Sequence, residues 1–375
     1  MSSDLKNSKI IKLFEKYTRL TPIQIHQPTI HTAQFNLIYF ITLEIVPSSE
    51  FTSTDFVLRL SKPMHPRIKT QNEVGWLTFL SQNSKLKVPK VLFWSDSTEE
   101  LGYEYTVIEK LSGQALCNIW ETIDPQCIVQ EVADIILELR ALTKKLEYHW
   151  FGGMTANGKA GAFVEVTSYT EEHINRYWSS SDYSDESYET LNLTSSFSSW
   201  DEYLKARIKR DIHVIETHQS CITLRTSFLF RLRKLLTRSN IMQKDTQSYI
   251  AHRDLHFANL LWSTETNSIS GVLDWELAGL YPLSDWNPGN TCWTVVERNN
   301  PESSSQEKLF EMLEEELSKR HAIVVENVES EEYQYRKIVS LTYWIVFRFV
   351  EGRKDDERVK EWIKQWEDYM EKLGI

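Results

Sequence analysis

The sequence predicts an α+β protein with a small, strand-rich N-terminal part and a larger, mainly helical C-terminal part. Before residue 110, short segments alternate apolar and polar residues and are rich in β-branched and aromatic side chains, as in an antiparallel sheet. After residue 124, apolar residues recur at intervals of three and four, as in amphipathic helices. The length of 375 residues is enough for two lobes or domains.

The N-terminal part contains four segments that read as strands and one that reads as a helix. The strands are expected at residues 35–44, 55–60, 88–94 and 103–109. A Pro-Ser-Ser-Glu turn at residues 47–50 separates the first two. Residues 70–80 are expected to form a helix because Val74, Leu77 and Leu80 then share one side.

The C-terminal part begins with a strong helix signal. Asp124 can cap a helix whose first residue is Pro125. Apolar residues then follow at helical spacing, at Ile128, Val132, Ile135, Ile136, Leu139, Leu142 and Leu146. We therefore divide the chain into an N-terminal lobe at 1–115 and a C-terminal lobe at 116–375.

Two later segments differ from the helical pattern. Residues 152–163 are dense in glycine and are expected to form a loop. Residues 179–199 are polar, acidic and poor in aliphatic side chains, which is typical of a mobile insert. A helix is expected to begin at about residue 198, and further helices are expected at 304–319, 329–350 and 355–373.

Composition limits the possible partners and location. The net charge of -11 and the pI near 5.5 argue against nucleic acid or an anionic membrane as the main partner. The four cysteines lack metal-binding spacing and read as free thiols, and the N-terminus lacks an apolar signal region. The most apolar stretch, 338–350, is shorter than the ~20 residues that span a bilayer. We expect a cytoplasmic protein.

The most informative stretch runs from Tyr249 to Leu261. It contains His252, Asp254 and Asn259 in the order His-x-Asp-x-x-x-x-Asn, and an apolar run ending in Asp274 follows. In phosphoryl transfer, one Asp accepts the proton of the attacking hydroxyl, while an Asn and a second Asp hold magnesium on ATP. Each residue alone could be a turn or cap residue. The ordered set favours the catalytic interpretation.

The surrounding residues resemble those of the aminoglycoside phosphotransferase and choline kinase type of small-molecule kinase. That family carries His-Gly-Asp-Leu-His-x-x-Asn and then Asp-Trp-Glu. This chain has His252-Arg-Asp-Leu-His-Phe-Ala-Asn259 and Asp274-Trp-Glu276. The resemblance implies a protein-kinase-like bilobal fold, with an antiparallel sheet in the N-lobe and a mainly helical C-lobe. It also implies ATP and Mg²⁺ as cofactors and a small-molecule hydroxyl as acceptor.

The resemblance also implies a role for each candidate site residue. Asp254 would deprotonate the acceptor and His252 would brace the catalytic loop, while Asn259 and Asp274 would bind magnesium. Arg59, paired with Glu73, would take the place of the strand lysine that neutralises the ATP phosphates. The segment Glu109-Lys-Leu-Ser-Gly-Gln114 resembles the hinge that meets adenine, so that Glu109 and Leu111 would contact the nucleotide.

Several residues depart from the family pattern or have two interpretations. Arg59 replaces a lysine, and no glycine occurs in the expected phosphate loop around residues 32–36. His256 could pack locally or lie near the transferred phosphate. Glu276 could be a solvated charge, a metal ligand or a residue that contacts a metal ligand. Asp285 could be a simple turn acid.

Three functions remain possible from the sequence. The leading one is an ATP-dependent phosphotransferase acting on a small-molecule hydroxyl. The second is a non-catalytic, kinase-like nucleotide-binding or scaffold protein, suggested by Arg59 and the glycine-poor loop. A protein kinase, suggested by Arg253, lacks support because no Ala-Pro-Glu follows Asp274. The acceptor could be an aminoglycoside, a choline-like amine, a sugar or an amino alcohol.

Overall fold

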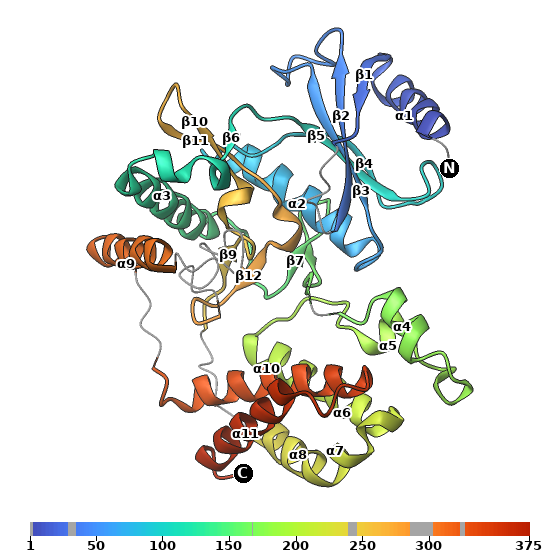
Figure 1. Ribbon diagram of the computed structural model, residues 1–375, viewed down its shortest axis with the longest axis vertical. Helices are drawn as coiled ribbons and strands as arrows, with labels where there is room; N and C mark the ends of the chain where they lie inside the picture. The colour runs from blue at the N-terminus through green and yellow to red at the C-terminus, as the bar shows by residue number, and fades with distance from the viewer. Residues whose placement is uncertain (1–2, 29–34, 167, 239–245, 286–302, 323–326) are drawn as a thin grey trace.

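The protein has two lobes, a sheet-containing N-terminal lobe and a mainly helical C-terminal lobe (Figure 1). The computed structural model describes residues 3–28, 35–166, 168–238, 246–285, 303–322 and 327–375. The predicted α+β class is confirmed.

A five-stranded antiparallel sheet forms the N-terminal lobe in the order β1-β2-β3-β5-β4. Its strands are β1 (Pro22–His26), β2 (Asn36–Leu43), β3 (Asp55–Ser61), β4 (Val91–Ser95) and β5 (Glu104–Glu109). The four predicted strands are all present within a few residues of their expected bounds. Strand β1 and the helix α1 (Ser3–Thr18) were not predicted.

The alternation of side chains along β3 decides where Arg59 lies. Phe56, Leu58 and Leu60 are buried in the core between the sheet and α1. Because successive side chains of a strand point to opposite faces, Arg59 lies on the other face of the sheet. That face is directed toward α2 and the C-terminal lobe.

Helix α2 (Ile68–Asn83) contacts both lobes. The predicted side of Val74, Leu77 and Leu80 is buried, but Trp76 on another side is buried too. Two segments contact α2 from the C-terminal lobe: residues 275–277, after Asp274, and the hairpin of β7 (Gly153–Met154) and β8 (Ala160–Gly161). The glycine-dense segment that we expected to be a loop is therefore a hairpin that packs on this helix.

Small sheets and helices make up the C-terminal lobe. The remaining strands are β6 (Gln114–Ala115), β9 (Tyr249–Ala251), β10 (Leu260–Ser263), β11 (Ser268–Val272) and β12 (Gly279–Tyr281). The helices are α3 (Pro125–Thr143), α4 (Glu171–Tyr177), α5 (Tyr188–Leu191), α6 (Trp200–Thr217), α7 (Ile222–Ser227), α8 (Leu229–Thr237), α9 (Ser303–Lys319), α10 (Glu331–Val350) and α11 (Glu357–Lys372). The predicted Asp124 cap is confirmed, since its side chain accepts a hydrogen bond from the Gln126 amide. None of the helices in the described ranges is long and apolar enough to cross a bilayer.

The chain passes between the lobes over residues 110–113. Strand β5 ends in the N-terminal sheet at Glu109, and β6 pairs with β10 of the C-terminal lobe. This crossing lies just before the division that we predicted after residue 115.

The segment 179–199, expected to be a mobile insert, contains a 3₁₀ turn and the helix α5. Tyr183, Leu191 and Phe197 are buried in the main core. Asn192 donates from its side chain to the Tyr169 carbonyl at 3.0 Å. These few apolar anchors, separated by serine and acidic residues, fix a segment whose average composition suggested mobility.

The close packing of α2 on the β7–β8 hairpin gives a stability prediction. A Cβ atom added at Gly75 would lie 2.4 Å from the Thr155 carbonyl oxygen, which belongs to the backbone. Gly75→Ala should therefore lower the free energy of unfolding by about 1–3 kcal/mol, although alanine alone favours a helix by about 1 kcal/mol over glycine. Urea denaturation measures the change. Ser81→Ala, at an exposed position of the same helix, is the control, and its free energy of unfolding should stay within about 0.5 kcal/mol of the parent protein. A Gly75→Ala variant that is more stable than the parent would contradict the close packing of Gly75 on the Thr155 carbonyl.

Candidate active site

The catalytic-loop candidates follow β9 and are organised by a buried histidine. His252 is fully buried and its Nε2 lies 2.8 Å from the Leu273 carbonyl oxygen. Its Nδ1 accepts a hydrogen bond from the Asp254 amide at 3.2 Å. These partners place the single proton on Nε2, where it is donated to Leu273. Burial, the largest influence, lowers the pKa of His252 from 6.5 to about 4, so the ring is neutral at pH 7.

Asp254 and Asn259 are in direct contact. The Asn259 Nδ2 donates to the Asp254 carbonyl oxygen at 2.9 Å and to its carboxylate at 3.0 Å. His256 Nε2 lies 3.5 Å from the same carboxylate, so His256 belongs to the site and does not merely pack locally. Burial opposes ionisation most strongly, but His256, His252 and Asn259 together hold the pKa of Asp254 below its usual value. The Asp254 carboxylate is therefore ionised at neutral pH.

Two hydrogen bonds join this loop to the turn that carries Asp274. One is the bond from His252 to the Leu273 carbonyl, and the other runs from the Leu273 amide to the Asn259 carbonyl at 2.8 Å. Trp275 packs its ring against His252, with 4.4 Å between the ring centroids. Asp274 follows Leu273 directly and has a left-handed backbone, with φ 66°. The structure thus brings Asp254, Asn259 and the Asp274 turn together.

Arg59 forms ion pairs with three carboxylates from the other elements. Its Nη1 lies 3.1 Å from Glu73, which confirms the predicted pair. Its Nη2 lies 2.6 Å from Asp274 and 3.0 Å from Glu276. Burial alone would lower the pKa of Arg59, but the three carboxylates raise it above its ordinary value. The guanidinium therefore stays charged and links β3, α2 and the Asp274 turn.

Glu276 is buried and belongs to a polar network, so it is not a solvated charge. Besides Arg59, its carboxylate accepts hydrogen bonds from Asn36 at 2.8 Å and from Lys69 at 3.3 Å. Lys69 is itself 2% exposed and also donates to the Phe35 carbonyl at 3.0 Å. The network connects α2 to the start of β2. Neither Lys69 nor Asn36 was predicted to belong to the site, because a lysine at the start of a helix usually faces solvent.

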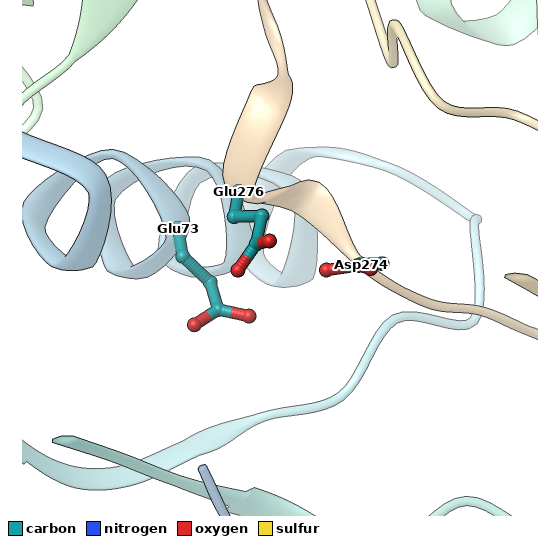
Figure 2. A group of neighbouring side chains, drawn as sticks. All are labelled: Glu73, Asp274 and Glu276. Carbon is teal, nitrogen blue, oxygen red and sulfur yellow. The ribbon is translucent and has the colours of Figure 1, made fainter. Parts of the chain in front are cut away.

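The carboxylates of Glu73, Asp274 and Glu276 lie close together, with ligand oxygens within 4.8 Å of one another (Figure 2). All three also pair with the Arg59 guanidinium. Three carboxylates face the two cations Arg59 and Lys69, which leaves an excess negative charge. Carboxylate and amide oxygens are the ligands that magnesium prefers. Among the described residues, the Asn259 amide oxygen accepts no hydrogen bond, so it is available as a further ligand. The residues present fit a divalent cation.

The two hinge candidates lie at the end of β5, away from the ion pairs. The Glu109 amide donates to the Lys90 carbonyl at 2.8 Å, and its carboxylate accepts from Thr52 at 3.3 Å. The Leu111 amide, in contrast, makes no hydrogen bond within the described part of the chain. Leu111 is thus better suited than Glu109 to donate to a ligand. The expected phosphate loop lies outside the described residues, except for Phe35 and Asn36.

Arg253 and Asp285 border the site on the side of the C-terminal lobe. The Arg253 guanidinium lies 4.3 Å from the centre of the Tyr281 ring and 3.6 Å from the Asp285 carboxylate. It also donates to the Asp285 carbonyl at 3.0 Å. Asp285 is therefore an ion-pair partner and more than a turn acid.

Residues 47–285 match the family described as APH, the phosphotransferase enzyme family. The chain belongs to the phosphotransferase enzyme family. The match includes Arg59, Glu73 and the whole segment from His252 to Glu276, and the resemblance that we identified from those residues is confirmed. No curated protein sequence matches the chain significantly.

Solved structures of two aminoglycoside phosphotransferases share the fold of this phosphotransferase-family chain. A thermostable mutant of APH(4)-Ia, in a ternary complex with AMP-PNP and hygromycin B, is 14% identical, with a TM-score of 0.53 over 97% of this chain and 98% of that chain. APH(2")-IIa, in a complex with gentamicin, is 12% identical, with a TM-score of 0.50 over 98% of this chain and 96% of that chain. At these identities the likeness shows the fold, which is the predicted protein-kinase-like fold.

The neutral, buried state of His252 gives a prediction on pH. The unfolded chain takes up a proton at this histidine as the pH falls below 6.5, whereas the folded protein does so only near pH 4. From pH 7.5 to pH 5, His252 should thus lower the free energy of unfolding by about 2 kcal/mol. His252→Gln keeps an amide donor for Leu273, so it should lose about 2 kcal/mol less over this range.

Urea denaturation at both pH values measures this difference. Because His65, His173 and His218 also have lowered pKa values, both proteins will still lose stability on acidification. His26→Gln, at an exposed position, is the matched control. Equal pH dependence in His252→Gln and the parent protein would contradict the neutral buried ring.

Proposed function

We propose that this phosphotransferase-family protein moves the γ-phosphate of ATP to a hydroxyl group of a small molecule. The observation that carries the proposal is the pair of hydrogen bonds that Leu273 makes with His252 and Asn259. It joins the Asp254–Asn259 contact to the turn in which Asp274 pairs with Arg59. A proton acceptor, oxygen ligands for a metal and a buried cation thus belong to one site.

Asp254 has the properties of the proton acceptor. Its carboxylate is ionised at neutral pH and its side chain is 37% exposed, so a hydroxyl can reach it. The acceptor oxygen forms a bond to the γ-phosphorus as the bond from that phosphorus to the β–γ bridging oxygen breaks. The hydroxyl proton goes to Asp254, and ADP leaves with the electron pair of the broken bond. His252 holds the Asp254 amide and so positions the loop for this transfer.

Asn259 and Asp274 would hold magnesium, with Glu276 and Glu73 close to Asp274. When bound, the ion neutralises charge on the transferred phosphate. Arg59 would neutralise further phosphate charge, and its pair with Glu73 fixes the direction of its guanidinium. The amide of Leu111 and the neighbouring Glu109 would meet the adenine. The complex of APH(4)-Ia with AMP-PNP supports a nucleotide as the phosphate donor. A cytoplasmic location fits an enzyme that uses ATP.

Removing the proton acceptor tests the chemistry. Asp254→Asn keeps the size of the side chain but not its basicity, so kcat should fall by about 10²–10⁴-fold with little change in the KM for ATP. The measurement is ADP release, first across a panel of hydroxyl-bearing metabolites to find an acceptor and then with that acceptor. Glu367→Gln, at an exposed position of α11, should leave the rate unchanged. Undiminished turnover by Asp254→Asn would rule out the assignment.

Thermal unfolding with ATP and magnesium tests the metal and phosphate ligands separately from turnover. A ligand present at a hundred times its Kd stabilises the folded state by about 2.7 kcal/mol. The parent protein should therefore unfold at a higher temperature with both ligands, and magnesium should add to the effect of ATP. Asp274→Asn should lose the magnesium-dependent part, and Arg59→Met should lose most of the ATP effect.

The same measurement separates the proposal from its main alternative. Stabilisation by ATP with no ADP release in any assay would indicate a non-catalytic nucleotide-binding protein. Neither stabilisation nor turnover would indicate a scaffold. An Asp274→Asn variant that keeps the full magnesium effect would contradict the metal assignment alone.

A further inference from the structure

A cluster of arginines and acids lies in the C-terminal lobe, beside the catalytic loop. Its arginines are Arg207 and Arg210 on α6, Arg253 in the catalytic loop and Arg336 on α10. Its acids are Glu165, Asp211 and Asp285. None of these residues has a part in the proton transfer or the magnesium site described above.

Three of the four arginines have carboxylate partners. Arg210 is paired with Asp211 at 3.1 Å and with Glu165 at 3.4 Å. Arg253 and Arg336 share Asp285, at 3.6 Å and 4.0 Å. All three carboxylates of the cluster are thus engaged by arginines other than Arg207.

Arg207 is the cation without such a partner. Within the described ranges of the chain, no carboxylate lies within ion-pair distance of its guanidinium. Its contacts are with the rings of Tyr203 and Tyr343, each 5.8 Å from the guanidinium carbon. Its Nε is buried and has no hydrogen-bond partner. A half-buried guanidinium that has no carboxylate partner keeps N–H donors available for an anion.

The position of Arg207 connects it to the candidate active site. Arg207 lies over the ring of Tyr203, and Arg253 lies over the ring of Tyr281. The ring of Phe163 packs between these two tyrosines, with 4.6 Å from its centroid to each. One group of packed aromatic rings therefore connects the two guanidiniums. Arg253 directly precedes Asp254, so an acceptor whose hydroxyl lies at Asp254 has the cluster beside it.

From this arrangement we infer that the phosphate acceptor carries an oxyanion group, a carboxylate or a phosphate, which Arg207 binds. The planar fork of a guanidinium matches two oxygens of either group. Among the described residues Arg207 has no carboxylate partner, and a bound oxyanion would take that place. The inference rests on the proposed function and adds the chemical class of its substrate.

The test compares acceptors that carry an anionic group with neutral and cationic counterparts. Hydroxy carboxylates are assayed for ADP release beside their neutral amides and the amino alcohols of equal length, at constant ionic strength. Glycerate, glyceramide and 3-amino-1,2-propanediol form one such set, and glycerol 3-phosphate with glycerol adds the phosphate arm. We expect turnover with an anionic member, and kcat/KM for its neutral partner lower by about 10–100-fold, the value of one charged hydrogen-bonded contact.

Variants of Arg207 show whether the preference comes from this side chain. Arg207→Gln should lose the preference for the anion by raising the acceptor KM, while kcat with saturating acceptor changes little. Arg207→Lys should recover part of it. Lys209→Gln, which removes an exposed charge two residues away on α6, should behave like the parent protein. Circular dichroism and the unfolding temperature verify that each variant is folded.

Each outcome decides the inference. A preference for neutral or cationic acceptors would overturn it while leaving the proposed phosphotransferase intact. A preference for anions that survives Arg207→Gln would also overturn it, because the oxyanion would then bind elsewhere. No ADP release with any compound, and no ATP hydrolysis in water, would overturn the proposed function and this inference with it.

Discussion

The buried ion pairs of Arg59 are the interaction on which the architecture of the site depends. The guanidinium and the carboxylates of Glu73 and Glu276 are buried together, and each has an opposite charge within 3.1 Å; the partly exposed Asp274 is the third partner. The three acids come from α2 and from the turn after β11, which are far apart in sequence. Removing Arg59 would leave the buried Glu73 without its ion-pair partner. The ion pairs therefore fix the N-terminal sheet, α2 and the Asp274 turn in one relative position.

Much of this arrangement could be predicted from sequence because it depends on local patterns. The alternation in residues 55–60 placed Arg59 on a strand, and helical spacing placed Glu73 on the next helix. The spacing of His252, Asp254 and Asn259 then predicted a loop that the structure places next to Asp274. Each of these predictions needs only the periodicity of one element or the length of one turn.

The rest depended on contacts between distant segments. Lys69 is buried because Glu276, more than 200 residues away, supplies its counter-charge, and no local pattern indicates this. The glycines at 152–161 suggested a loop, but Gly153 lies so close to Asn72 that a Cβ atom there would be 2.4 Å from the Asn72 oxygen. Arg207 likewise looks like an ordinary helical cation. Only the positions of the acids around it, all engaged by other arginines, set it apart.

The pairing of β6 with β10 has a mechanical consequence. The covalent crossing between the lobes is short, residues 110–113, and the strand beyond it is hydrogen-bonded to the strand that follows Asn259. A rotation of one lobe against the other would pivot at this crossing. A ring bound against Leu111 would lie near this pivot, whereas a rotation of the lobes would have to break the ion pair between Arg59 and Asp274. The distance between the Arg59 Nη2 and the Asp274 carboxylate, 2.6 Å here, would thus show whether the two lobes have moved apart.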